Sequence, residues 1–122
     1  RDLRMSRGLG DVYKRQVNQQ SQIVGFSSIT SQGYLHSMFV HKDFQGEGIA
    51  TMLLEEIERY AITAGITRIT SEVSLTARPF FEKKGYVVEK EQKRKANQLS
   101  LTNFLMAKEV AFLEYYNKRV TD

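Results

Sequence analysis

The sequence contains no cysteine, and this absence excludes several kinds of chemistry at once. Disulfides, a thiolate nucleophile and a cysteine-based zinc site all need the thiol group. The two histidines, His36 and His41, are too few to build a metal site from histidine, so we expect no metal. The chain also lacks a run of about 18 apolar residues, which predicts that no segment spans a membrane.

The 122 residues suffice for one domain, and 41% of them are hydrophobic and 26% charged. This composition is typical of a globular protein and excludes a disordered or fibrous chain. The net charge of +4 raises the question of nucleic-acid binding. However, residues 1–16 hold five basic and two acidic side chains, whereas residues 17–122 hold 13 basic and 12 acidic ones. The excess positive charge therefore belongs to the first segment.

Residues 1–16 (RDLRMSRGLGDVYKRQ) show neither a helical nor a strand period, and they lack the apolar core of a signal peptide. They resemble a translated sequencing-adapter artefact, and a natural disordered arm is the alternative. We therefore expect this segment to be non-native, poorly ordered and removable without a change in thermal stability. On this hypothesis the domain is an N-terminally truncated fragment that occupies residues 17–122.

The rest of the chain predicts a mixed α/β fold in the order β-β-α-β-α-β-β, with helices on the faces of a mixed sheet. Strands are expected over Ile23–Ile29, Tyr34–Val40, Thr67–Val73, Tyr86–Glu91 and Gln98–Glu109, and helices over Ile49–Ala64 and Thr76–Lys84. Gly65 and Gly85 are placed to end the helices, and Thr76 to cap the second one. The crossover from residue 34 to residue 73 implies one parallel pair of strands. Gln92–Asn97 is expected to be a loop, and Ala111–Val120 a short amphipathic helix.

The loop before the long helix has the features of an anion site. Gly46, Glu47 and Gly48 offer no side chain that caps a helix well, so the first helical N–H groups are unclaimed. The helix dipole adds partial positive charge there, which suits a phosphate or pyrophosphate. A plain glycine-rich turn capped by water is the alternative. A P-loop is excluded because no lysine follows Gly48, and His41–Gln45 is too long for a Rossmann turn.

Several spaced motifs resemble the GNAT N-acetyltransferase superfamily. Gln45-x-x-Gly48-x-Ala50 is similar to its R/Q-x-x-G-x-G/A signature, and Ala77–Tyr86 is similar to its A-x-x-h-Y-x-x-x-G-F segment. Ser74–Phe81 together with Leu101–Phe104 resembles the YafP-like branch. The resemblance implies that acetyl-CoA, as cosubstrate, is bound by Met38, Phe39, Val40, Gln45, Gly46, Glu47, Gly48, Ile49, Ala50, Thr51, Ser74 and Phe81.

The resemblance also frames the candidate catalytic residues. A GNAT acceptor amine must lose a proton before it attacks the thioester, and Glu72 and His36 are the candidate bases. A surface carboxylate and a structural strand histidine are the alternatives. The chain has Ser74 where the family commonly has asparagine, and Phe81 where it commonly has the tyrosine that acts as general acid. Turnover is therefore expected to rely on water or on another hydroxyl such as that of Tyr86.

These observations favour a cytoplasmic, acetyl-CoA-dependent N-acetyltransferase with an amine acceptor. A CoA-binding module without turnover is the alternative, because the strand and two helices that help build the family's acceptor pocket are not found before Val17. A basic nucleic-acid-binding module is the third reading, based on the cluster Lys90, Lys93, Arg94 and Lys95. No aromatic residues interleave with that cluster, so we expect a solvated turn and no nucleic-acid or membrane partner. An exposed sheet edge left by truncation would favour a homodimer.

Overall fold

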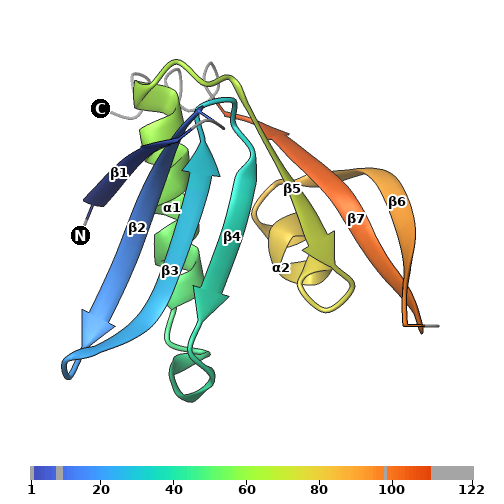
Figure 1. The fold of residues 1–122 in the computed structure, drawn as a ribbon, viewed down its shortest axis with the longest axis horizontal. Coiled ribbons are helices and arrows are strands. Elements are labelled where there is room, and N and C mark those ends of the chain that lie inside the picture. The colour runs from blue at the N-terminus through green and yellow to red at the C-terminus, as the bar shows by residue number, and fades with distance from the viewer. Residues whose placement is uncertain (1, 8–9, 98, 111–122) are drawn as a thin grey trace.

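The computed structural model describes residues 2–7, 10–97 and 99–110, which form two sheets and two α-helices (Figure 1). The elements are β1 (Asp2–Arg7), β2 (Gly10–Gln19), β3 (Gln22–Thr30), β4 (Leu35–Val40), a 3-10 turn (Lys42–Phe44), α1 (Ile49–Thr63), β5 (Arg68–Ser74), α2 (Arg78–Lys83), β6 (Val87–Ala96) and β7 (Leu99–Glu109). The mixed α/β class and, from residue 22 onward, the expected element order are confirmed. Within the described ranges, neither helix has the length and apolarity needed to cross a bilayer.

The strands form two antiparallel sheets instead of the single mixed sheet that the sequence predicts. Their strand orders are β1-β2-β3-β4 and β5-β7-β6. The expected parallel relation between β4 and β5 is confirmed, but it is limited to one bridge between Tyr34 and Thr70. Beyond that bridge the two strands diverge (Figure 1). Because β5 pairs along its whole length with β7, its other edge faces the gap between the sheets.

Both helices end as the sequence predicts, at glycines in the left-handed region. Gly65 follows α1 with a φ of +81°, and Gly85 follows α2 with a φ of +94°. Only glycine adopts this conformation without steric cost, so the chain reverses direction at these points and returns to a strand.

Two local predictions in the second half of the chain are wrong. The N-cap of α2 is Ala77 rather than Thr76, and the Ala77 N–H donates to the Ser74 hydroxyl at 3.1 Å. The segment Gln92–Asn97 is not a loop, because β6 continues as far as Ala96. Its polar side chains resemble a loop sequence since this end of the hairpin is exposed on both faces. The expected helix over Ala111–Val120 lies outside the described residues.

The structure also differs from expectation over residues 1–16, where it contains β1 and most of β2. Tyr13 is buried, and its ring stacks on that of Tyr60 in α1 with 4.0 Å between centroids. Arg15 lies 4.0 Å from Glu56, also in α1. Val17 packs against the start of α1, but before it the described positions of β2 that face α1 are an aromatic and an arginine, so no hydrophobic alternation marks this part of the strand in the sequence.

The core lies between α1 and the two sheets. One face of α1 supplies Leu54, Ile57 and Ala61, all of them 1% exposed or less. The same cluster takes in buried side chains from both sheets and from α2, including Ile29, Leu35, Ile69, Val73, Phe81, Phe104 and Met106. A smaller cluster of Val24, Ile49 and Leu53 fixes the first turns of α1 against β3. The start of α1 is therefore held firmly over the first sheet.

The packing of Tyr13 gives the first testable prediction. Tyr13→Ala should destabilise the protein by about 3 kcal/mol, because it removes a buried ring and its stacking on Tyr60 from the α1 interface. Urea unfolding followed by circular dichroism measures the loss. Gln19→Ala, at an exposed position of the same strand, should stay within about 0.5 kcal/mol of the native chain. Equal stability of Tyr13→Ala and the native chain would show that β2 does not pack as described.

Candidate functional site

The loop between β4 and α1 is held in place by its own side chains. The Asp43 N–H donates to His41 Nδ1 at 3.1 Å, and the Gln45 side-chain amide donates to the Val40 carbonyl at 3.4 Å. Gly46 and Gly48 follow with φ values of +83° and +81°. These two left-handed residues lie in the turn that leads from β4 into α1, and the end of β4 and the start of α1 line one cavity.

The N-terminus of α1 is uncapped by any side chain. Gly48 is the N-cap residue, and no side-chain hydrogen bond closes the first turn. A Cβ atom built on Gly46 or on Gly48 would meet no other atom within 4 Å, so the space beside both glycines is open. Unclaimed amide N–H groups, the positive end of a helix dipole and an open approach together fit a phosphate group.

A cavity of about 510 Å³ adjoins this helix N-terminus, and we call it the first cavity. The residues that line it carry no charge. Nine predicted cofactor residues are brought together there: Met38, Val40, Gln45, Gly46, Gly48, Ile49, Ala50, Thr51 and Phe81. Three further lining residues, Phe44, Ala77 and Phe80, were not predicted. Ala77 and Phe80 are themselves positions of the Ala77–Tyr86 motif, and only the fold shows that they face this cavity.

The other three predicted cofactor residues do not line the first cavity. Phe39 is 43% exposed, and its ring lies 5.4 Å from that of Phe26. Successive side chains of a strand point to opposite faces of the sheet. Because Met38 and Val40 line the first cavity, Phe39 between them points to the other face. Glu47 is exposed in the loop, and the Ser74 hydroxyl accepts from the Ala77 N–H. Backbone contacts of Phe39 with a ligand stay a prediction.

A second cavity, of about 330 Å³, lies in the gap between β4 and β5. Both candidate bases, His36 on β4 and Glu72 on β5, line it. It shares Met38, Ala77 and Phe81 with the first cavity. The structure therefore places the candidate bases on one side of a common wall and the helix N-terminus on the other.

The Glu72 carboxylate has a partner. Arg94 on β6 donates to both of its oxygens, at 3.3 and 3.4 Å. Tyr34 stands in the same electrostatic environment: burial and the Glu72 charge raise the pKa of its hydroxyl, and Arg94 partly opposes them. One member of the basic cluster is thus engaged beside the second cavity, while Lys90, Lys93 and Lys95 are exposed.

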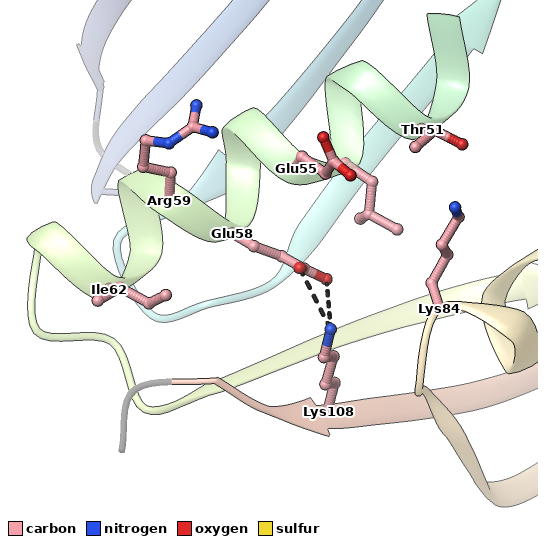
Figure 2. Close-up of a pocket in the computed structure, with 8 residues that line it drawn as sticks. Thr51, Glu55, Glu58, Arg59, Ile62, Lys84 and Lys108 are labelled. Atoms are coloured by element: carbon pink, nitrogen blue, oxygen red, sulfur yellow. Dashed lines mark hydrogen bonds and ion pairs between the residues drawn. The ribbon is translucent and has the colours of Figure 1, made fainter. Parts of the chain in front are cut away.

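Tyr86 is not brought to either cavity. It is 2% exposed, and its hydroxyl donates to Glu58 at 2.8 Å. Lys108 donates to both oxygens of the same carboxylate at 3.2 Å (Figure 2). Burial and the Glu58 carboxylate raise the pKa of Tyr86 far above its ordinary value. The predicted alternative acid is therefore a poor proton donor and faces away from the site, although its ring packs edge-on against Phe81 at 5.2 Å.

A third cavity, of about 320 Å³, lies between α1, β7 and the end of α2 (Figure 2). Charged side chains of Glu55, Glu58, Arg59, Lys84 and Lys108 line it, and Thr51 connects it to the first cavity. No group of three histidine, aspartate or glutamate side chains in the described part of the chain is arranged to hold a metal ion.

Comparisons with known proteins agree with this geometry. The "Uncharacterized N-acetyltransferase YafP" of Escherichia coli (strain K12) is 31% identical over 86 residues, which are 70% of this chain and 53% of that protein. The chain thus spans about half the length of this curated relative. The GCN5-related N-acetyltransferase structure from Rhodopseudomonas palustris superposes with a TM-score of 0.71 at 28% identity, covering 80% of this chain and 60% of that one.

A second structural neighbour was solved with coenzyme A bound. An aminoglycoside 6'-N-acetyltransferase complexed with coenzyme A superposes with a TM-score of 0.70 at 20% identity, covering 81% of this chain and 73% of that one, and shows the same fold. The family described as "Acetyltransferase (GNAT) domain" matches residues 9–109, which include the whole of β2 and extend to the end of β7. The chain therefore belongs to the GNAT acetyltransferase family, whose enzymes use acetyl-CoA.

Proposed function

We propose that this chain binds acetyl-CoA and transfers the acetyl group to an amine. The observation that carries the proposal is the meeting of two cavities at Met38, Ala77 and Phe81. One cavity offers an uncapped helix N-terminus, and the other offers two groups that can accept a proton. A transferase needs both, because the acyl donor and the acceptor must meet at one point.

The first cavity suits the cofactor in its charge and its shape. The pyrophosphate would be held by the amide N–H groups at the start of α1, where Gly46 and Gly48 leave the approach open. The apolar walls formed by Met38, Val40 and Phe81 suit the uncharged pantetheine arm. Glu47, in the loop, and Ser74, which lines the second cavity, stay predicted contacts of the cofactor.

The second cavity suits the acceptor. Glu72 or His36 would take a proton from the ammonium group, directly or through water, so that the free amine can attack the thioester carbonyl. The new C–N bond replaces the C–S bond, and the departing thiolate takes up a proton. Phe81 has no hydroxyl and that of Tyr86 is bound to Glu58, so we assign this proton to water. A thiol titrates near pH 8.5, so a thiolate leaves with little help.

Ala50→Glu tests the cofactor site. Position 50 lies in the first turn of α1 and lines the first cavity, so a carboxylate there repels a phosphate. Calorimetry should show that CoA affinity falls by about tenfold or more. The fold should be unharmed, because an acidic side chain in a first helical turn adds about 0.5 kcal/mol of stability.

The matched control is Met52→Glu, which adds the same charge to an exposed position of the same helix outside the first cavity. It should leave CoA affinity within about twofold of the native value. Gly48→Val is a poorer test, because a positive φ makes any branched side chain strained there regardless of the ligand. Unchanged affinity in folded Ala50→Glu would refute the cofactor assignment.

Glu72→Gln tests the base. We expect kcat/KM for amines to fall about a hundredfold, because a positioned general base contributes about that much. Arg94→Gln controls for the broken ion pair and should cost much less. CoA affinity should not change in either variant. If His36→Gln abolishes the acidic limb of the pH–rate profile, where a general base becomes protonated, and Glu72→Gln leaves that limb intact, the base is His36.

Phe81→Tyr tests the missing acid. This substitution restores the hydroxyl that the family commonly has, on a ring that lines both cavities. We expect kcat to be preserved or to rise up to about tenfold, since the added hydroxyl would assist a leaving group that already leaves readily. Complete loss of activity in a stably folded Phe81→Tyr protein would show that the ring does not occupy the acid position.

A CoA-binding module without turnover is the second candidate function. This function needs only the first cavity and makes no use of the candidate bases in the second. The two functions differ in one measurement: the module binds CoA but acetylates no member of an amine panel, as followed by release of the free thiol.

A further inference from the structure

The residues that line the first cavity include no cation to balance the negative charge of the cofactor. None of its side chains is charged, yet CoA carries a phosphate on the ribose 3' oxygen in addition to its pyrophosphate. The helix N-terminus accounts for the pyrophosphate alone. A second positive group is therefore to be sought at the rim of the cavity.

Lys84 lies at that rim. Its ammonium group is 5.6 Å from the ring centroid of Phe80, which lines the first cavity. The Lys84 side chain also lines the third cavity together with Thr51, the residue that both cavities share. Figure 2 shows the lysine extending from the loop after α2 toward the first turns of α1.

The backbone of Lys84 is fixed, so the position of the side chain is set by the fold. It is the C-cap residue of α2, and its N–H is shared between the carbonyls of Phe80 and Phe81 at 3.2 and 3.1 Å. A cation over an aromatic face is held there by the ring quadrupole. The ammonium group is thus kept beside the cavity instead of sweeping freely through solvent.

The other cations of the third cavity are already engaged. Lys108 is bound to Glu58 at 3.2 Å, and Arg59 is bound to Glu56 at 2.9 Å. Within the described residues, no carboxylate lies within ion-pair distance of Lys84. Glu55 lines the same cavity and opposes the binding of an anion there. Lys84 is therefore the cation of this surface that is available to a ligand.

We propose that Lys84 binds the 3'-phosphate of CoA, and so selects CoA over dephospho-CoA. The inference rests on the proposed function, because it assumes that the pyrophosphate lies at the start of α1. It assigns the cofactor's nucleotide end to the rim between α1 and the end of α2. Glu55 then limits the affinity through repulsion, and the helix amides stay responsible for the pyrophosphate.

The test compares CoA with dephospho-CoA by calorimetry on the native chain and on Lys84→Met. The methionine keeps the apolar stem but removes the charge. We expect Lys84→Met to bind CoA about five- to tenfold more weakly and to bind dephospho-CoA as the native chain does. The difference should shrink as salt is raised, because the site is partly exposed.

Three further variants sharpen the result. Lys83→Met removes the same charge from the neighbouring exposed position, which lines none of the three cavities, and should change neither affinity. Lys84→Arg keeps the charge and should retain the preference for CoA. Glu55→Gln should tighten CoA binding about twofold with little effect on dephospho-CoA, since it removes a repulsive charge. Urea unfolding confirms that each variant is folded.

Two outcomes overturn the inference. If Lys84→Met weakens both ligands equally, or still prefers CoA as strongly as the native chain, Lys84 does not read the 3'-phosphate, while the proposed function stands. If the native chain binds neither ligand, the proposed function fails and the inference fails with it. Because the native chain is measured in the same experiment, the two failures are distinguished.

Discussion

The close contact between Gly33 and β5 is the constraint on which the site depends. The Thr70 N–H donates to the Gly33 carbonyl at 2.9 Å, beside the single parallel bridge that joins the sheets. Gly33 has a φ of +91°, and a Cβ atom there would collide with the Arg68 carbonyl. Only glycine permits both the conformation and the approach. The sheets are thus joined at one end, and the gap beyond it is where the second cavity lies.

Further hydrogen bonds fix the second sheet to the first sheet and to α1. Ser71 donates to the Leu35 carbonyl at 3.0 Å near the bridge, and on the α1 side the Glu58 carboxylate accepts from Tyr86 and Lys108. A carboxylate that is largely buried needs such partners, because an unpaired charge in this position is costly. Glu58 therefore links α1 to β7 and to Tyr86. The Tyr86 ring in turn packs against Phe81, which lies in the wall between the first and second cavities.

Phe81 and Tyr86 carry the aromatic rings of the Ala77–Tyr86 motif, but the hydroxyl group is on the second ring instead of the first. In the motif that the α2 region resembles, the hydroxyl stands at the residue matched by Phe81, and the residue matched by Tyr86 is phenylalanine. Here the hydroxyl belongs to Tyr86, five residues later, and it donates to Glu58 instead of facing a cavity. The chain keeps two aromatic rings in contact but places the polar atom outside the site.

The sequence predicts this fold best where one periodicity dominates. The apolar face of α1 and the glycines at 46, 48, 65 and 85 determine the helix, its loop and the turns, and all of these were found. The sequence does not predict the part of β2 before Val17, because Tyr13 and Arg15 occupy its inward positions, where the partners are another ring and a carboxylate. Such cross-element partners leave no trace in a local pattern. The division into two sheets was missed for the same reason, since a crossover implies the direction of pairing but not its length.

Motifs locate the candidate site but do not orient its side chains. The alternation of β4 turns Phe39 away from the cavity that Met38 and Val40 line, and the end of α2 brings Lys84 to its rim. Both outcomes depend on which face of an element meets α1. That helix serves all three cavities: its N-terminus and first turn face the first, its buried face supports the wall shared with the second, and its charged side lines the third. The uncharged first cavity and the charged third cavity therefore meet at Thr51 in the first turn of one helix.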